Sequence, residues 1–378
     1  MSPFTEARMH LAVELTAAGR HPAAARWARL DPAVLLSAVH HAGLVRTAAR
    51  RGLDLVLLPH TFHPDGGPLL DAVSLAARIA PVVPGIGLAP TATVTHTEPF
   101  HLSKAIATLD IVSAGRAGWE PAVSRTQVEA DLFGRKQAAP ADELWREAAD
   151  AIEVVVRLWD SWEDDAVIRD AATGRYVDRD KLHHIDFQGE FFSVKGPSIT
   201  PRPPQGHPPV VLRCDEDEAL PVAARWADVV RISAPDLTAA AAARDRIRDA
   251  VAGAGRDPDD VTVLLDVEVH LAADRDQARR DLVELDRLAG AELPASSVRV
   301  LGPPTDLADL VGAAVRTRAA DGVTLVPLVL PADLDVVAAQ VVPLLAGRGL
   351  LRTGSAGGSL RARFGLARPA NHFTGASA

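Results

Sequence analysis

Three side chains suited to proton transfer follow or open predicted strands, namely His60, His96 and Glu120. A histidine titrates near neutral pH, and a carboxylate can hold a proton or stabilise a neighbouring charge, so this combination is typical of general acid–base chemistry. The prediction that they are catalytic requires a fold that brings them to one place.

A run of four acids, Asp215 to Glu218, begins where another apolar segment ends. Acids at the start of a helix favour its N-terminal dipole, which predicts a solvated helix start. Carboxylate oxygens also suit magnesium or calcium, although four adjacent acids cannot all converge on one ion. Both interpretations stay open from the sequence, and we predict no metal site.

Composition and motifs exclude several classes of protein. The 378 residues carry 40 Lys and Arg against 49 Asp and Glu, and a net charge of −9 does not fit nucleic-acid binding. Cys214 is the single cysteine, so an internal disulfide and a multi-thiolate zinc site are impossible. Gly85 and Gly87 precede Pro90 where a dinucleotide fingerprint would need a helix, and the sequence contains neither a phosphate loop nor a nucleophile elbow. Since no segment reaches the roughly 18 apolar residues of a bilayer span, we expect a cytoplasmic protein that does not bind membranes.

Short apolar runs rich in β-branched residues alternate with helical periodicity, which indicates βα units around a parallel sheet. The predicted strands are Met9–Leu15, Leu53–Leu58, Val82–Leu88, Gly118–Val123, Pro209–Arg213, Asp228–Ile232, Val261–His270 and Gly322–Leu328. That number of strands predicts an α/β fold, a (β/α)8 TIM-like barrel.

The remaining segments are predicted to be helices, an insertion and a tail. One helix begins after Asp31 and ends at Gly52, and a long one covers Ala141–Trp159. Residues 1–378 then form a single barrel domain with an insertion at about 163–205 and a C-terminal tail at about 347–378. Ligands bind such barrels at the carboxyl ends of the strands. This rule places eight residues near one mouth: His60, Thr93, Thr95, His96, Glu120, Cys214, Asp215 and Ser233.

Several longer stretches carry a family resemblance. They include Trp159-Asp-Ser-Trp162, Lys181-Leu-His-His-Ile-Asp186, Gln188-Gly-Glu-Phe-Phe192, Pro201-Arg-Pro-Pro-Gln-Gly206 and Thr108-Leu-Asp-Ile-Val-Ser-Ala-Gly-Arg-Ala-Gly-Trp119. In collinear order from about Met9 to His372, the sequence resembles the nitrilotriacetate monooxygenase, pristinamycin synthase and dibenzothiophene-sulfone monooxygenase branch of the bacterial-luciferase-like flavin monooxygenases.

This resemblance implies a dimeric TIM-like barrel, as a homodimer or as a heterodimer with a paralogue. It also implies a two-component reaction, in which a separate flavin reductase supplies reduced FMN and a small organic or natural-product substrate is oxygenated in a pocket that excludes water. The residues expected to bind the cofactor are Thr93, Thr95, Trp119, Trp145, Arg213 and Cys214.

The sequence departs from the family pattern where the flavin would bind. Pro59-His60 stands where an acidic residue is usual, Glu120 where an asparagine is usual, and Arg213-Cys-Asp-Glu-Asp-Glu218 where a small turn helps to bind the FMN phosphate. Acids beside a phosphate would repel it by roughly 2 to 4 kcal/mol per charge pair. Two alternatives therefore stay open: a flavin-free cyclase- or isomerase-type enzyme, and a noncatalytic subunit.

Overall fold

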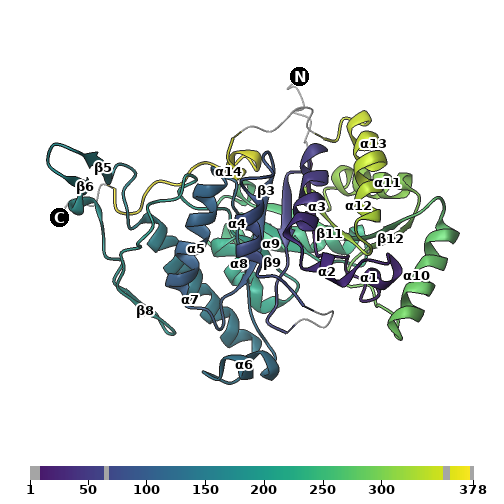
Figure 1. The fold of residues 1–378 in the computed structure, drawn as a ribbon, viewed down its shortest axis with the longest axis horizontal. Helices are drawn as coiled ribbons and strands as arrows, with labels where there is room; N and C mark the ends of the chain where they lie inside the picture. Colours follow the sequence, from purple (N-terminus) through teal and green to yellow (C-terminus); the bar gives the residue numbers. More distant parts are fainter. Residues whose placement is uncertain (1–8, 64–67, 352–357, 375–378) are drawn as a thin grey trace.

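The computed structural model describes residues 9–63, 68–351 and 358–374, and parallel strands surrounded by helices form its centre (Figure 1). Within these residues the central strands follow the order β4-β3-β2-β1-β13-β11-β10-β9. The bounds of these strands are β1 His10–Glu14, β2 Leu55–Leu58, β3 Gly87–Thr93, β4 Glu120–Ala122, β9 Val211–Arg213, β10 Val229–Ile232, β11 Thr262–Leu271 and β13 Gly322–Pro327. A parallel bridge between Trp119 and Val210 joins the first and last strands of this order. The predicted (β/α)8 TIM-like barrel is therefore confirmed.

Helices lie around the strands and follow them in the βα order expected of a barrel. Their bounds are α1 Ala24–Trp27, α2 Pro32–Leu35, α3 Ala38–Arg50, α4 Ala72–Ile79, α5 Pro99–Val112, α6 Gln127–Phe133, α7 Ala141–Asp160, α8 Leu220–Trp226, α9 Leu237–Gly253, α10 Arg275–Ala289, α11 Pro304–Arg316, α12 Ala332–Val336, α13 Val342–Gly347 and α14 Leu360–Arg363. A π-helical turn at Val337–Val341 joins α12 to α13, so these helices form one nearly continuous helix.

Two predicted elements were wrong in their bounds. The third strand is Gly87–Thr93, so the prediction of Val82–Leu88 came too early. The strand continues through Pro90, which donates no N–H and lies beside Leu58 of β2. The helix predicted from Asp31 to Gly52 is two helices, since Ser37 begins a new helix and accepts a hydrogen bond from the backbone N–H of His40.

Residues 163–205 do not contribute a strand to the barrel. They form two hairpins, β5 (Val167–Asp170) with β6 (Arg175–Val177) and β7 (Phe187–Gln188) with β8 (Ser193–Val194). A short strand, β12 (Arg299–Gly302), pairs with the second half of β11. The C-terminal segment runs from α14 toward the β5–β6 hairpin (Figure 1). Arg368 binds the Asp164 carboxylate there, which joins the tail to the insertion.

The barrel strands alternate between two apolar clusters. Leu11 and Val13 of β1 face the helices, whereas Ala12 between them joins a smaller inner cluster. Leu360, Phe364 and Leu366 from the tail complete this inner cluster, so α14 closes the amino-terminal end of the barrel. Gly87 makes room for α14, because a Cβ at this position would overlap Leu360 Cδ1.

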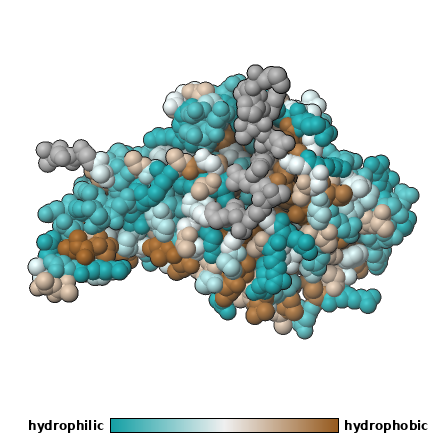
Figure 2. Space-filling view, turned by 90° about the horizontal axis from the view of Figure 1, so that it is seen from above, coloured by the Kyte–Doolittle hydropathy of each residue, from teal (hydrophilic) through white to brown (hydrophobic). Residues whose placement is uncertain are grey.

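The face seen from above in the view of Figure 2 is mostly hydrophilic.

The packing of α14 into the barrel predicts that truncation of the Leu360 side chain lowers the stability of the fold. Leu360 is fully buried, so Leu360→Ala should lower the free energy of unfolding by about 2–5 kcal/mol through lost burial and a residual cavity. Leu132→Ala in α6 is the matched control, because Leu132 is 62% exposed. Urea unfolding measures both variants; equal midpoints would show that the tail does not close the barrel.

A buried histidine near the carboxyl end of β11 joins this strand to two helices. His270 Nδ1 lies 3.1 Å from Asp333 and Nε2 lies 3.3 Å from Asp281, and the edge of Trp27 packs against the ring. Burial lowers the pKa of His270, but the hydrogen bonds and charges of the two aspartates outweigh it and raise the pKa above its usual 6.5. His270 lines neither of the two largest pockets among the described residues.

The contacts of His270 with the two aspartates predict that the free energy of unfolding falls as the pH rises. A histidine whose pKa is raised on folding stabilises the fold fully below its unfolded pKa of about 6.5, and this contribution disappears as pH rises through the folded pKa. Unfolding free energies of the wild type and His270→Gln between about pH 6 and pH 9 should therefore converge as pH rises. His101→Gln, at an exposed position of α5, should keep the wild-type pH profile. Parallel wild-type and His270→Gln curves would contradict the assignment.

Candidate functional site

An arginine inside the barrel is the centre of a buried ionic network. Arg231 of β10 is 1% exposed and donates 2.7 Å to Glu14 of β1 and 2.8 Å to Glu120 of β4. It also makes a two-pronged contact to Asp266 of β11, at 3.1 and 2.9 Å. One guanidinium thus links four strands across the barrel, and each of its carboxylate partners is also buried.

The pairing fixes the charges of Glu14 and Arg231. Burial alone would raise the pKa of Glu14, but Arg231 and Arg213 lower it to about 2. Burial would likewise lower the pKa of Arg231, yet Asp266, Glu120 and Glu14 raise it above its ordinary value. The carboxyl group of Glu14 is therefore ionised and Arg231 is protonated at neutral pH.

Two further arginines extend the network toward solvent. Arg213 at the end of β9 donates 2.8 Å to Asp266 and reaches Asp215 at 3.4 Å. Arg20 lies 3.3 Å from Glu268, a buried acid of β11 that also accepts from Arg299. Each cation near the mouth is thus accompanied by a carboxylate.

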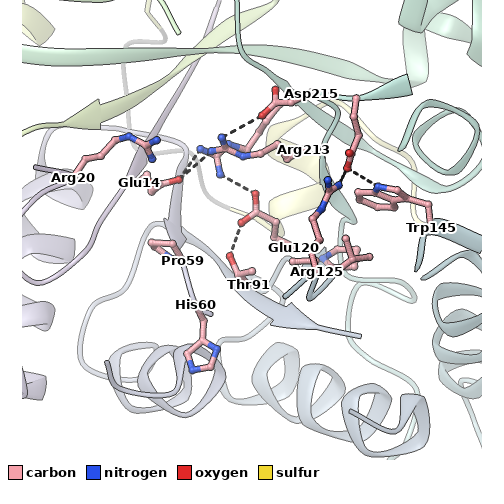
Figure 3. A pocket seen from close by; sticks show the side chains of 15 residues that line it. Glu14, Arg20, Pro59, His60, Thr91, Glu120, Arg125, Trp145, Arg213 and Asp215 are labelled. Carbon is pink, nitrogen blue, oxygen red and sulfur yellow. Dashed lines mark hydrogen bonds and ion pairs between the residues drawn. The ribbon is translucent and has the colours of Figure 1, made fainter. Parts of the chain in front are cut away.

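A cavity of about 460 Å³ lies on this network at the carboxyl ends of the strands (Figure 3). Its lining includes Glu14, Arg20, His60, Thr91, Glu120, Arg125, Trp145, Arg213, Asp215, Glu216 and Arg231. A second cavity of about 490 Å³ shares Glu14, Arg20, Pro59 and His60 with the first. These volumes are those of small-molecule sites.

The acidic run divides into inward and outward members. Glu216 accepts 2.6 Å from the indole N–H of Trp145 and pairs with Arg125, and it lines the cavity. Asp215 accepts from the backbone N–H of Ser233 and from Arg213. Asp217 and Glu218 are exposed, and Asp217 pairs with Arg246. The solvated interpretation of the sequence thus fits Asp217 and Glu218, whereas Glu216 and the exposed Asp215 line the cavity.

Four of the predicted catalytic or cofactor-binding residues line the cavity of about 460 Å³, which we call the main cavity because it lies on the network: His60, Glu120, Trp145 and Arg213. Asp215, predicted near the mouth, lines it as well. His60 stands at the junction of the two large cavities, with its ring edge against Phe62. Both carboxylate oxygens of Glu120 are occupied, one by Arg231 at 2.8 Å and the other by the Thr91 hydroxyl at 2.5 Å. Glu120 therefore holds Arg231 in place, with one hydrogen bond accepted by each carboxylate oxygen.

His96 and Thr95 line a separate, smaller cavity of about 210 Å³. The ring of His96 stacks on Phe133, burial lowers its pKa, and the charge of Lys136 lowers it further. Thr95 accepts a hydrogen bond from the backbone N–H of Ser124, and Thr93 is the buried last residue of β3. The structure therefore does not unite His96 with His60 and Glu120 in one cavity.

Two predicted cofactor contacts pack away from the cavity lining. Trp119 is fully buried in the apolar cluster between strands and helices, where it meets the edge of Trp159. Cys214 packs against the same cluster, and burial raises the pKa of its thiol to about 11. Its thiol is therefore neutral at pH 7.

Sequence reasoning missed the residues that hold the site together, above all Arg231, Glu14, Asp266 and Glu216. A signal for three of them existed, because each is a charged residue in a mostly apolar strand at a position that alternation turns inward. For Glu216 the sequence offered no such signal, since all members of its run look alike.

Among residues 9–63, 68–351 and 358–374, no cluster of three His, Cys, Asp or Glu side chains is arranged to hold a metal ion. No helix within the same ranges is long and apolar enough to cross a membrane.

Comparison with known proteins identifies the family. The model of the family described as luciferase-like monooxygenase matches residues 15–333. The chain belongs to this family. Nitrilotriacetate monooxygenase component A from Aminobacter aminovorans is 30% identical, over 96% of this chain and 98% of that protein. N-acetyl-S-(2-succino)cysteine monooxygenase from Bacillus subtilis is 28% identical, over 97% of this chain and 98% of that protein.

Solved structures agree with this assignment at the level of the fold. EDTA monooxygenase from Chelativorans sp. BNC1 superposes with a TM-score of 0.86 at 24% identity, covering 96% of this chain and 99% of that one. The family resemblance deduced from the sequence is confirmed. Full-length relatives of this luciferase-like chain are monooxygenases of small organic compounds, so the flavin-free enzyme and the noncatalytic subunit are not favoured.

The buried network predicts the effect of removing its cation. Arg231→Met would leave Glu14, Glu120 and Asp266 facing one another without their shared partner. The free energy of unfolding should fall by about 3–5 kcal/mol. Arg246→Met is the control, because its pair with the exposed Asp217 should contribute at most about 1 kcal/mol. Guanidinium unfolding curves measure both, and similar small losses would refute a central role for Arg231.

Proposed function

We propose that the chain is the oxygenase component of a two-component monooxygenase that uses reduced FMN from a separate flavin reductase to oxygenate a small organic substrate. One observation carries this proposal: a chain similar to monooxygenases over almost its whole length has a large polar cavity at the carboxyl ends of its barrel strands. That end is where barrel enzymes bind their ligands.

The donors around the cavity are compatible with FMN. The indole of Trp145 offers a flat wall, and Arg125 and Arg213 offer guanidinium groups of the kind that bind phosphate. The acidic turn does not present four free charges, because Asp217 and Glu218 point to solvent while Asp215 and Glu216 are each paired with an arginine. Phosphate repulsion is therefore limited to the two inward acids.

When bound, reduced flavin supplies the activation of molecular oxygen. The chain's own contribution is to bind, orient and exclude water. Arg231 and its carboxylates form a charged floor that is fixed in position. His60, at the junction of the two large cavities, is the residue placed to exchange a proton with a substrate in either one.

The relatives' names indicate the kind of substrate. Nitrilotriacetate and N-acetyl-S-(2-succino)cysteine are small and acidic, whereas the dibenzothiophene sulfone and long-chain alkane of two other relatives are mostly apolar. A cavity with Arg20 and Arg213 on its wall suits a substrate that carries an acidic or strongly polar group. A cytoplasmic location and a dimeric state remain predictions from the sequence.

Anaerobic titration with oxidised and reduced FMN tests the proposal. Saturable binding of reduced FMN is expected, followed by oxygen consumption when air is admitted. Ala122→Trp should abolish binding by filling the cavity, and Val128→Trp, at a position 49% exposed on α6, should bind as the wild type does. If neither form of FMN binds the wild type saturably, the proposed function is wrong.

A further inference from the structure

The wall of the main cavity holds a set of hydrogen-bond donors that a carboxylate of the chain already occupies. The indole N–H of Trp145 donates 2.6 Å to Glu216, and the guanidinium of Arg125 pairs with the same carboxylate. All three side chains line the cavity, and Figure 3 shows Arg125 and Trp145 together on one side of it, away from Arg20.

These donors come from three separate parts of the fold. Arg125 follows β4, Trp145 lies in α7, and Glu216 lies in the turn after β9. Trp145 is only 6% exposed, so its indole N–H requires an acceptor on the cavity side. A positively charged fork beside a buried N–H is a donor set for an anion, since both groups donate and neither accepts.

Glu216 accepts from both donors, but it does not close them off from the cavity. The side chain of Arg125 is 46% exposed and that of Glu216 is 25% exposed, so a ligand in the cavity can reach both. A phosphate that approached these donors would meet the carboxylate in the position that its own oxygens would take. Binding then requires either displacement of Glu216 or acceptance of two like charges close together.

We propose that Arg125 and Trp145 form an anion-binding site which Glu216 fills in the free protein, and that Glu216 weakens binding of a phosphate-bearing ligand relative to the same ligand without phosphate. The inference rests on the proposed flavin function for its ligand, FMN, whose counterpart without phosphate is riboflavin. Glu216 is thus a specificity-determining residue, and its action is electrostatic.

The test compares FMN with riboflavin on matched variants. Glu216→Gln removes the charge but keeps an oxygen that can accept from Trp145, so folding is preserved. Glu218→Gln changes the same type of residue in the same turn, at an exposed position. Dissociation constants for both flavins are measured at low salt, where exposed charges are least screened.

Glu216→Gln should bind FMN at least about tenfold more tightly than the wild type, while riboflavin binding changes by less than about twofold. Glu218→Gln should match the wild type for both flavins. Adding Arg125→Met to Glu216→Gln should remove most of the gain for FMN. Unchanged or weaker FMN binding by Glu216→Gln, with riboflavin binding intact, would overturn the inference and leave the proposed function standing.

Inorganic phosphate separates failure of the inference from failure of the flavin function. If no variant binds either flavin, the proposed function is wrong, and calorimetric titration with phosphate then decides the anion site. Phosphate binding by Glu216→Gln, lost in the double variant with Arg125→Met and absent from Glu218→Gln, would support the site. Equal phosphate titrations for all variants would refute it.

Discussion

A guanidinium inside a barrel is stable only where carboxylates surround it, and the remainder of the site depends on how this requirement is met for Arg231. Glu14, Glu120 and Asp266 come from three other strands, so the network ties the ring together across its interior. An isolated buried charge would be costly, whereas a paired and hydrogen-bonded one is tolerated. The same pairing makes Glu120 part of the framework of the site.

The two ends of the barrel are therefore chemically different. At the amino-terminal end Leu360 and Phe364 of the tail fill the interior with apolar side chains, and at the carboxyl end the ionic network forms the base of a polar cavity. Both large cavities adjoin Glu14 of this network, so a small molecule has room at the carboxyl end. The C-terminal tail closes the other end.

The cavity wall combines cations with carboxylates of the chain itself. Arg213 is accompanied by Asp215, and Arg125 by Glu216, so a ligand meets partly neutralised arginines. These carboxylates compete with an anionic ligand for the arginines. The competition affects which ligands bind, because an anionic group must either displace the carboxylate or bind beside it. The scaffold that carries this wall is that of the luciferase-like monooxygenases.

The sequence by itself determined the class of fold and the family, because period-two apolar runs and long collinear motifs depend on local order along the chain. It also placed His60, Trp145 and Arg213 near the mouth, since residues after barrel strands share one end. Only the tertiary structure decided which acids of the 215–218 run face inward, that Trp119 packs outside the ring, and that His96 occupies another cavity. Those outcomes depend on contacts between residues far apart in sequence, such as Trp145 with Glu216 and Arg231 with Glu14, and no local pattern encodes such a pairing.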